Sequence, residues 1–185
     1  RDLRLADHQP LAEAIALDGP VLLLYYIEPD LLKNPHYRGR HWHFIGQSLM
    51  AMNNQLKPFG TEVHILEGKP EALLQALHRA IPIQKLFSHE ETGLQTTFER
   101  DLRVAKWCRG NGVDWQEFQT NGIQRGRKNR KGWNRSWHQV MSADEVSIDL
   151  TRLAKKALPL PEALAGARSL RLRSWHEQKP EFLVG

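Results

Sequence analysis

The sequence predicts an α/β fold: a Rossmann-like, doubly wound parallel sheet of about five strands, followed by an irregular or helical linker. Short apolar runs bounded by glycine and proline recur along residues 1–122. Amphipathic helical patterns separate these runs, and strands that alternate with helices need right-handed crossovers and a mostly parallel sheet. The chain has 185 residues, 41% of them hydrophobic, which suffices for a core of ordinary size.

Composition narrows the class of protein further. The apolar fraction is too high for a disordered chain, and no apolar run approaches the roughly 20 residues needed to span a bilayer. The single cysteine, Cys108, excludes an intramolecular disulfide framework and is typical of a reducing compartment. We therefore expect a cytoplasmic protein with no signal peptide and no membrane partner.

The first half of the chain predicts a short helix, a strand and a long helix. Residues 10–17 form the short helix, with Pro10 in its first turn. Residues 21–27 are an unbroken apolar run between Gly-Pro and Glu-Pro pairs, which predicts a strand buried on both faces. Residues 40–56 form the long helix, because apolar side chains recur at helical spacing: Ile45, Leu49, Met52 and Leu56.

The second half continues the alternation. The pattern predicts strands over residues 61–66, 83–87 and 113–119, and helices between them, the last over residues 96–109. A helix that follows residues 1–5 directly should itself come after a strand. The first strand of the sheet is therefore expected to be cut or missing at the N-terminus.

The periodic signal fades after residue 122, which predicts a domain boundary there. Residues 1–122 are expected to be the α/β domain and residues 123–185 an interdomain linker. Residues 132–140 predict one or two helical turns, and Pro159 and Pro161 mark a connector.

Sheet topology predicts the position of a ligand site. In open parallel sheets, ligands bind beyond the carboxyl ends of the strands, and a helix N-terminus adds free N–H groups and a positive dipole end. The corresponding loops and the start of the long helix carry charged side chains for a polar ligand and an aromatic side chain for a planar one. The expected cofactor-binding residues are Arg4, Glu28, Arg40, His41, Phe44, Glu90 and Glu91.

Other site types lack a local signature. The chain has neither the Gly-rich dinucleotide-binding motif nor the phosphate-binding P-loop motif. We predict no metal site: His41 and His43 point to different faces of a helix, and no cysteine or carboxylate completes a ligand set. On the residues alone, the ligand of this α/β domain stays open.

Basic residues are concentrated in one segment. The chain carries 26 Lys and Arg against 21 Asp and Glu, a net charge of +5. Such a surplus is compatible with a phosphate backbone or an acidic partner surface, and equally with a solvated loop. Six basic residues fall within residues 125–135, where there is no acid: Arg125, Arg127, Lys128, Arg130, Lys131 and Arg135.

Several motifs together resemble DNA photolyases and cryptochromes. Residues 1–8, RDLRLADH, resemble the family signature R-D-L-R-L-x-D-[NH] that follows its first strand. Residues 89–92, HEET, are similar to a motif of the cryptochrome-DASH branch and its bacterial relatives. Further matches follow in family order: the G-x-P turn at residues 68–70, the R-D-x-x-V helix at residues 100–104, and the linker start at residues 126–141.

The resemblance implies the N-terminal antenna domain of a flavin-dependent photolyase or cryptochrome. Such a domain binds a light-harvesting chromophore: a folate, a deazaflavin or a flavin. FAD and damaged DNA would belong to a C-terminal helical FAD-binding domain, the expected partner, which this sequence lacks. The intact protein would be a deoxyribodipyrimidine photo-lyase-like enzyme for light-driven repair of pyrimidine dimers, or a blue-light photoreceptor. The chain alone would contain no catalytic residue and would be inactive.

Two alternatives come from other classes of protein. The first is a stand-alone nucleotide-binding or hydrolase-like α/β protein, in which residues 123–185 pack on their own sheet. The second is a nucleic-acid-binding module that uses the basic residues 125–135, above all Arg125, Arg127, Lys128, Arg130 and Lys131.

Overall fold

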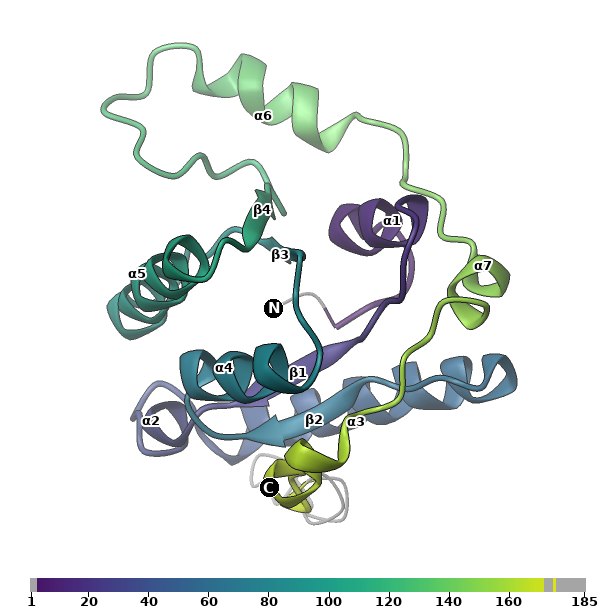
Figure 1. The fold of residues 1–185 in the computed structure, drawn as a ribbon. Coiled ribbons are helices and arrows are strands. Elements are labelled where there is room, and N and C mark those ends of the chain that lie inside the picture. Colours follow the sequence, from purple (N-terminus) through teal and green to yellow (C-terminus); the bar gives the residue numbers. More distant parts are fainter. Residues whose placement is uncertain (1–2, 172–174, 176–185) are drawn as a thin grey trace, which may run out of the picture. The chain divides into compact units, whose positions relative to one another are not determined.

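The computed structural model describes residues 3–171 and residue 175, and its helices and strands alternate as predicted (Figure 1). The chain forms two compact units. Unit 1 comprises Arg1–Leu17 and Ile83–Ile148, and unit 2 comprises Asp18–Pro82 and Asp149–Gly185. Each unit contains one pair of parallel strands, which confirms the predicted α/β class.

Unit 2 is built on strands β1 (Leu24–Ile27) and β2 (His64–Glu67), which pair in parallel with Leu24 opposite His64. Between them come α2 (Pro29–Leu32), α3 (Gly39–Leu56) and the short 3-10 helix η1 (Lys57–Phe59). Helix α4 (Pro70–Ala80) follows β2. The predicted amphipathic pattern of α3 is confirmed, because Leu49, Met52 and Leu56 on its apolar face are buried.

Residues 155–171, here called the strap, return along unit 2 after helix α7 (Leu150–Ala154). Ala157 pairs in parallel with Val21, and Arg168 pairs in antiparallel with Leu66. Backbone hydrogen bonds therefore join the strap to β2 and to the segment that precedes β1. The strap contains the 3-10 helix η2 (Glu162–Ala167), which packs on α4. This distant part of the chain therefore belongs to the core of unit 2.

Trp175 is also fixed within unit 2. Its indole stacks on that of Trp42, with ring centroids 4.9 Å apart, and its backbone carbonyl lies 2.8 Å from Nδ1 of His43. Both indoles are buried. Helix α3 thus holds this residue through one stacked ring pair and one polar contact.

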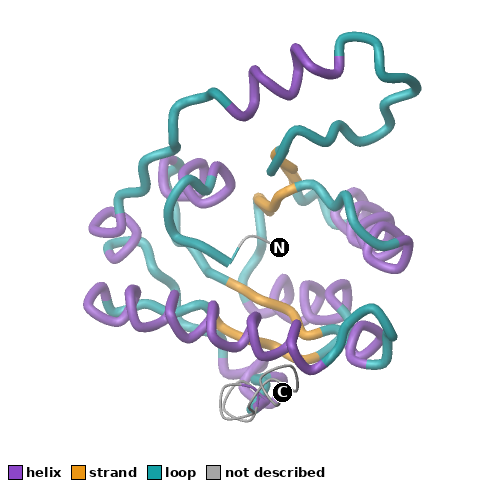
Figure 2. Tube along the Cα trace, turned by 180° about the vertical axis from the view of Figure 1, so that it is seen from behind, coloured by secondary structure: helices purple, strands orange, loops and turns teal. Residues whose placement is uncertain are grey.

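Unit 1 is built on strands β3 (Lys85–His89) and β4 (Asp114–Phe118), which pair in parallel along their full length. Helix α5 (Gln95–Gly110) connects them, and helix α1 (Gln9–Ala16) packs on both strands. Helix α6 (Trp133–Met141) follows a loop after β4, and the connections on both sides of α6 are loops in Figure 2.

The strand predicted over residues 21–27 is shorter in the structure, and it is less buried than the prediction of burial on both faces requires. Only residues 24–27 form the ladder, and of these only Ile27 is buried, while Leu24, Tyr25 and Tyr26 are half-buried. Within the described residues of unit 2, the ladder partner of β1 is β2. The strand expected before Arg1 lies outside the described residues and stays a prediction.

Cys108 lies on the buried face of α5. Burial raises the pKa of its thiol to about 11, although the neighbouring Arg109 opposes this shift. The thiol is therefore protonated at neutral pH and packs as an apolar side chain. Among the residues that the structure describes, no helix is long and apolar enough to cross a membrane.

Candidate functional site

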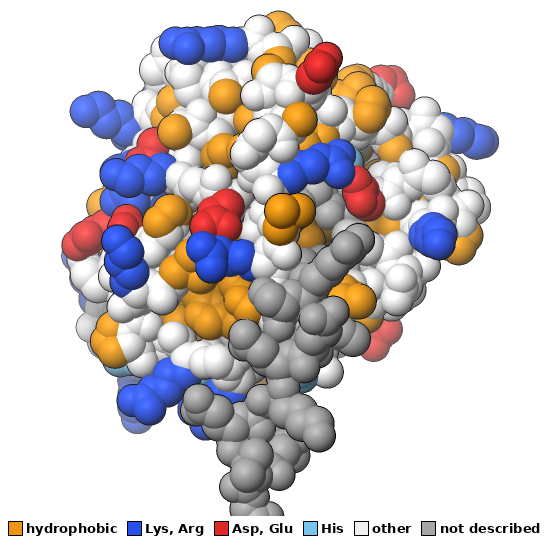
Figure 3. All heavy atoms as spheres, turned by 90° about the horizontal axis from the view of Figure 1, so that it is seen from below, with side chains coloured by type: hydrophobic (Ala, Val, Ile, Leu, Met, Phe, Trp, Pro, Cys, Tyr) orange, Lys and Arg blue, Asp and Glu red, His pale blue; other side chains and the backbone are white. Residues whose placement is uncertain are grey.

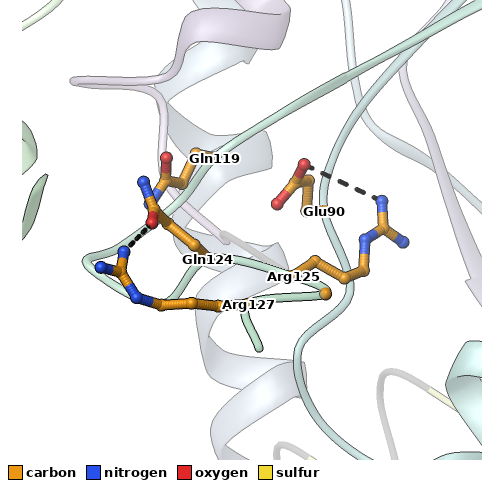
Figure 4. Close-up of a pocket in the computed structure, with 6 residues that line it drawn as sticks. Glu90, Gln119, Gln124, Arg125 and Arg127 are labelled. Atoms are coloured by element: carbon orange, nitrogen blue, oxygen red, sulfur yellow. Dashed lines mark hydrogen bonds and ion pairs between the residues drawn. The ribbon is translucent and has the colours of Figure 1, made fainter. Parts of the chain in front are cut away.

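A polar pocket of about 340 Å³ opens in unit 1 where strands β3 and β4 end. Its lining joins an acid, two side-chain amides and two guanidinium groups. Figure 4 shows Arg127 directed toward Gln124 on one side and Arg125 directed toward Glu90 on the other. The six lining residues are Glu90, Gln119, Gln124, Arg125, Gly126 and Arg127. This is the carboxyl end of a parallel strand pair, where open α/β sheets bind ligands.

Backbone pairing and one tight turn build the pocket. The N–H of Glu90 donates to the carbonyl of Phe118 at 2.8 Å, which fixes the exit of β3 against the end of β4. The next residue, Gln119, donates through Nε2 to the carbonyl of Asn121 at 2.7 Å. The side chain of Asn121 in turn accepts from the N–H of Ile123 at 2.8 Å. This turn brings residues 124–127 back over the strand ends.

Arg125 is the central charge of the pocket. It donates to Glu117 at 2.7 Å and lies 4.0 Å from a carboxylate oxygen of Glu90. Burial by itself would lower the pKa of Arg125, but the hydrogen bond and charge of Glu117, together with the charge of Glu90, outweigh it and raise that pKa. Arg125 therefore stays charged while its longer contact leaves Glu90 room for a ligand group.

Arg127 is fixed by the loop itself. Its Nε donates to the carbonyl of Asn129 at 2.7 Å, and its terminal nitrogens donate to the amide oxygen of Gln124 and to the carbonyl of Lys131. The pocket wall on this side is therefore held by side-chain bonds to backbone. The lining as a whole offers both donors and acceptors of hydrogen bonds.

The other site residues predicted for unit 1 have partners elsewhere. Glu91 accepts from the N–H of Gly93 at 2.7 Å and from Arg100 at 3.2 Å, and Arg100 also donates to the buried Asp101 at 2.8 Å. Arg4 pairs with Asp7 at 3.2 Å. Of the residues predicted for cofactor binding, Glu90 is therefore the one that lines this pocket.

Four predicted site residues lie in unit 2. Glu28 is buried at the N-terminus of α2, and Phe44 is 66% exposed. Arg40 is exposed in the first turn of α3, and Nδ1 of His41 accepts from the N–H of Arg38 at 3.1 Å, which caps that helix. That these residues form one site with those of unit 1 stays a prediction.

Sequence reasoning missed three of the lining residues, Gln119, Gln124 and Gly126. Arg125 and Arg127, which also line the pocket, were predicted as nucleic-acid contacts. The rule for carboxyl ends of strands would have included Gln119, because it directly follows β4. No local signal marks Gln124. It reaches the pocket only because the chain turns at Asn121.

A second pocket, of about 480 Å³, lies in unit 2 beside the strap. Its lining includes Asn53, Glu62, His64 and Arg168. His64 is buried, and Nδ1 lies 3.1 Å from a carboxylate oxygen of Glu62. Desolvation lowers the pKa of His64 even though the charge of Glu62 opposes it, so the imidazole is neutral at pH 7. Glu62 also pairs with Arg168 of the strap at 3.4 Å, whereas the side chain of Asn53 bonds the backbone of Val63.

The fold and the first pocket define an α/β domain with a polar pocket at the carboxyl end of parallel strands. A sequence model of the family described as DNA photolyase matches residues 1–127. The chain therefore belongs to the DNA photolyase family, as the resemblance of its motifs predicted. This membership supports an antenna-binding N-terminal domain of a flavin-dependent photolyase or cryptochrome.

Curated relatives and solved structures agree with this assignment. Cryptochrome DASH of Gloeobacter violaceus is 29% identical over 113 residues, covering 56% of this chain and 22% of the relative. The chloroplastic/mitochondrial cryptochrome DASH of Solanum lycopersicum is 29% identical over 97 residues, covering 49% of this chain and 17% of the relative. The chain thus spans about a fifth of the length of these relatives.

Two solved structures share the fold over 97% of this chain. The archaeal photolyase of Sulfolobus tokodaii, solved with two FAD molecules, aligns with a TM-score of 0.71 at 17% identity and is covered over 40% of its length. The class III photolyase of Agrobacterium tumefaciens aligns with a TM-score of 0.69 at 20% identity and is covered over 37%.

Proposed function

We propose that this chain binds an antenna chromophore in the pocket of unit 1 and belongs to a protein in which a C-terminal domain holds FAD. The observation that carries the proposal is the pairing of Glu90 with Arg125 beside two amide side chains at the end of β4. A bound chromophore would absorb light and pass its excitation energy to FAD.

The lining residues suit the polar edge of a folate or flavin-type ring. Such edges alternate N–H and C=O groups. Glu90 would accept from a ring N–H, and Gln119 and Gln124 would pair with either kind of group. Arg125 would hold a carbonyl or an anionic ring while it stays anchored on Glu117. The volume of about 340 Å³ is at the lower end of the range for small-molecule pockets, enough for one ring system.

The activity of the intact protein is part of the same proposal. It would be light-driven repair of pyrimidine dimers in DNA or blue-light sensing, in the cytoplasm. The pocket lining contains no Ser, Cys or His that could act as nucleophile or base with its acid, which disfavours a hydrolase. Because the proposal assigns FAD and the DNA lesion to a C-terminal domain, the 185-residue chain should repair no dimer-containing oligonucleotide under blue light, even with FAD added.

The test is ligand binding by the chain itself. Folate, flavin and deazaflavin are titrated separately against the 185-residue protein, and the dissociation constant is measured from ligand fluorescence. Glu90→Gln should weaken the ligand that binds about tenfold or more, because a charged hydrogen bond is removed. The exposed Glu145 of the same unit provides the matched control, Glu145→Gln, which should leave the constant unchanged. Failure of all three ligands to bind, or equal constants for Glu90→Gln and the wild type, would refute the proposal.

A further inference from the structure

The basic segment divides into two groups with different surroundings. Arg125 and Arg127 are tied to the pocket by Glu117 and by loop carbonyls. A second group, here called the cationic turn, is exposed and has no ion pair among the residues that the structure describes: Lys128, Arg130, Lys131 and Arg135. The first group supports the pocket, which leaves the charge of the cationic turn without a structural role.

No acid compensates the cationic turn along the chain. Residues 119–143 contain no Asp or Glu. On the face of the molecule drawn in Figure 3, by contrast, several Lys and Arg side chains lie beside Asp or Glu side chains. Four unpaired cations within eight residues concentrate positive potential, and phosphate groups are the partners that such a surface attracts.

The cationic turn has a defined backbone. Arg127 bonds the carbonyls of Asn129 and Lys131 from inside the turn, and the side chain of Asn129 accepts from the N–H of Lys131 at 3.0 Å. Gly132 has a φ of 73°, the left-handed conformation that lets the chain enter α6. The turn thus presents its cations from a bonded loop, which lowers the entropy cost of binding a ligand.

Trp133 adds a partly exposed aromatic side chain to the same segment, with its ring centroid 6.3 Å from that of Trp137. Its side chain is 40% exposed, and it stands between Lys131 and Arg135 in the sequence. Trp137, one turn later, faces inward: a Cβ on Gly122 would lie 2.0 Å from its ring. An exposed indole beside cations is the combination with which proteins stack unpaired bases and neutralise the adjoining phosphates.

We propose that the cationic turn and Trp133 bind single-stranded nucleic acid without regard to sequence. Phosphates would contact Lys128, Arg130, Lys131 and Arg135, and a base would stack on Trp133. An anionic membrane is the less suitable partner, because membrane-surface helices expose a continuous apolar face and α6 turns Trp137 against its own loop. The proposal concerns a surface outside the chromophore pocket and does not depend on the proposed function.

The experiment measures fluorescence anisotropy of a labelled oligothymidylate of about 15 nucleotides with the full chain at several salt concentrations. Changing Lys128, Arg130, Lys131 and Arg135 to Gln should lower the slope of log K against log salt by about 0.7 for each phosphate that is no longer neutralised. Trp133→Ala should weaken binding to the single strand about fivefold or more and leave binding to duplex DNA unchanged.

The control removes the same charge elsewhere. Lys57, Arg79, Lys106 and Arg109 are exposed, lie outside the segment, and are changed to Gln together. This variant should keep the salt slope of the wild type. Equal slopes for the two quadruple variants, no binding by the wild type, or binding to phosphatidylserine vesicles as tight as to the oligonucleotide would overturn the proposal. Circular dichroism spectra establish that all variants are folded.

Discussion

Each unit has a glutamate at the end of a parallel strand, and the two glutamates differ in their hydrogen-bond and ion-pair partners. In unit 2, Glu67 ends β2 and both its oxygens accept from Arg171, at 2.8 and 3.0 Å, while Ser169 donates to it as well at 3.2 Å. In unit 1, Glu90 follows β3 and lies 4.0 Å from Arg125, which bonds Glu117 more closely. In unit 2 the strap covers the end of β2, whereas in unit 1 the pocket lies at the end of β3.

The difference shows how one arrangement can serve either structure or binding. In both units an arginine from a later segment approaches a glutamate at a strand end. In unit 2 that segment also pairs with the strand, as the strap pairs with Leu66, and both oxygens of the carboxylate accept hydrogen bonds. Where the segment turns away, as residues 119–127 do, the carboxylate keeps acceptor capacity for a ligand.

The largest expected effect is a loss of stability in unit 2, where the buried Leu153 precedes the strap. Leu153, in the helix that leads into the strap, has no exposed surface, whereas Leu170, in the strap, is 88% exposed. Leu153→Ala should lower the free energy of unfolding by about 2–5 kcal/mol, because it leaves a cavity in the core of unit 2. Urea titration followed by circular dichroism measures it. Leu170→Ala is the matched control and should have almost no effect; similar decreases for both would mean that the strap is not anchored in the core.

An intermediate effect is expected in unit 1. Gly122→Ala would place a Cβ 2.0 Å from Cδ1 and 2.7 Å from Nε1 of Trp137, so the indole must move. Overpacking of this kind costs about 1–3 kcal/mol. Tryptophan emission should shift to longer wavelength as the ring becomes more exposed. At Gly110 a Cβ meets nothing within 4 Å, so Gly110→Ala should leave the spectrum unchanged. An unaltered spectrum for Gly122→Ala would show that Trp137 does not close this loop.

The smallest effect concerns the ion pair that closes unit 2. The hydrogen bond from Arg171 holds the pKa of Glu67 below its ordinary value, although partial burial opposes it. This pair therefore stabilises the fold fully above the ordinary glutamate pKa, and the contribution disappears as the pH falls through the lowered pKa. Because both side chains are partly exposed, Glu67→Gln should cost at most about 1 kcal/mol at pH 7.

Comparing denaturation midpoints of Glu67→Gln and the wild type at pH 7 and near pH 3 tests this sign. The gap between them should narrow at the lower pH. The exposed Glu162 of η2, which has no ion pair among the described residues, supplies the control Glu162→Gln. A gap that widens on acidification would contradict the assigned direction.

Helices could be predicted closely because their apolar periodicity is strong and their ends are marked. The prediction over residues 96–109 matches Gln95–Gly110, and that over residues 40–56 matches Gly39–Leu56. Strand bounds were less regular: residues 83–87 became Lys85–His89 and residues 61–66 became His64–Glu67, whereas residues 113–119 differ from Asp114–Phe118 by one residue at each end. The displacement moves His89 from a predicted loop into β3, where it is buried against the ring of His8 at 4.6 Å.

The strap and most of the pocket could not be predicted from local patterns. The strap depends on partners about a hundred residues away, such as the bond from the N–H of Ser169 to the carbonyl of Ile65. Glu90 was predicted because the rule for strand ends needs only the strand itself. Gln124 was missed because its place depends on a turn whose geometry is set by the Asn121 side chain.

The division of the chain into units has a consequence for how the molecule assembles. Each unit is discontinuous: unit 1 needs Arg1–Leu17 to meet Ile83–Ile148, and unit 2 needs Asp18–Pro82 to meet Asp149–Gly185. Neither can be excised as one uninterrupted fragment. Each must close a long loop before its non-local contacts form, and such closure slows folding. The interleaved order makes the two units kinetically dependent on each other, since each connecting segment of one is part of the body of the other.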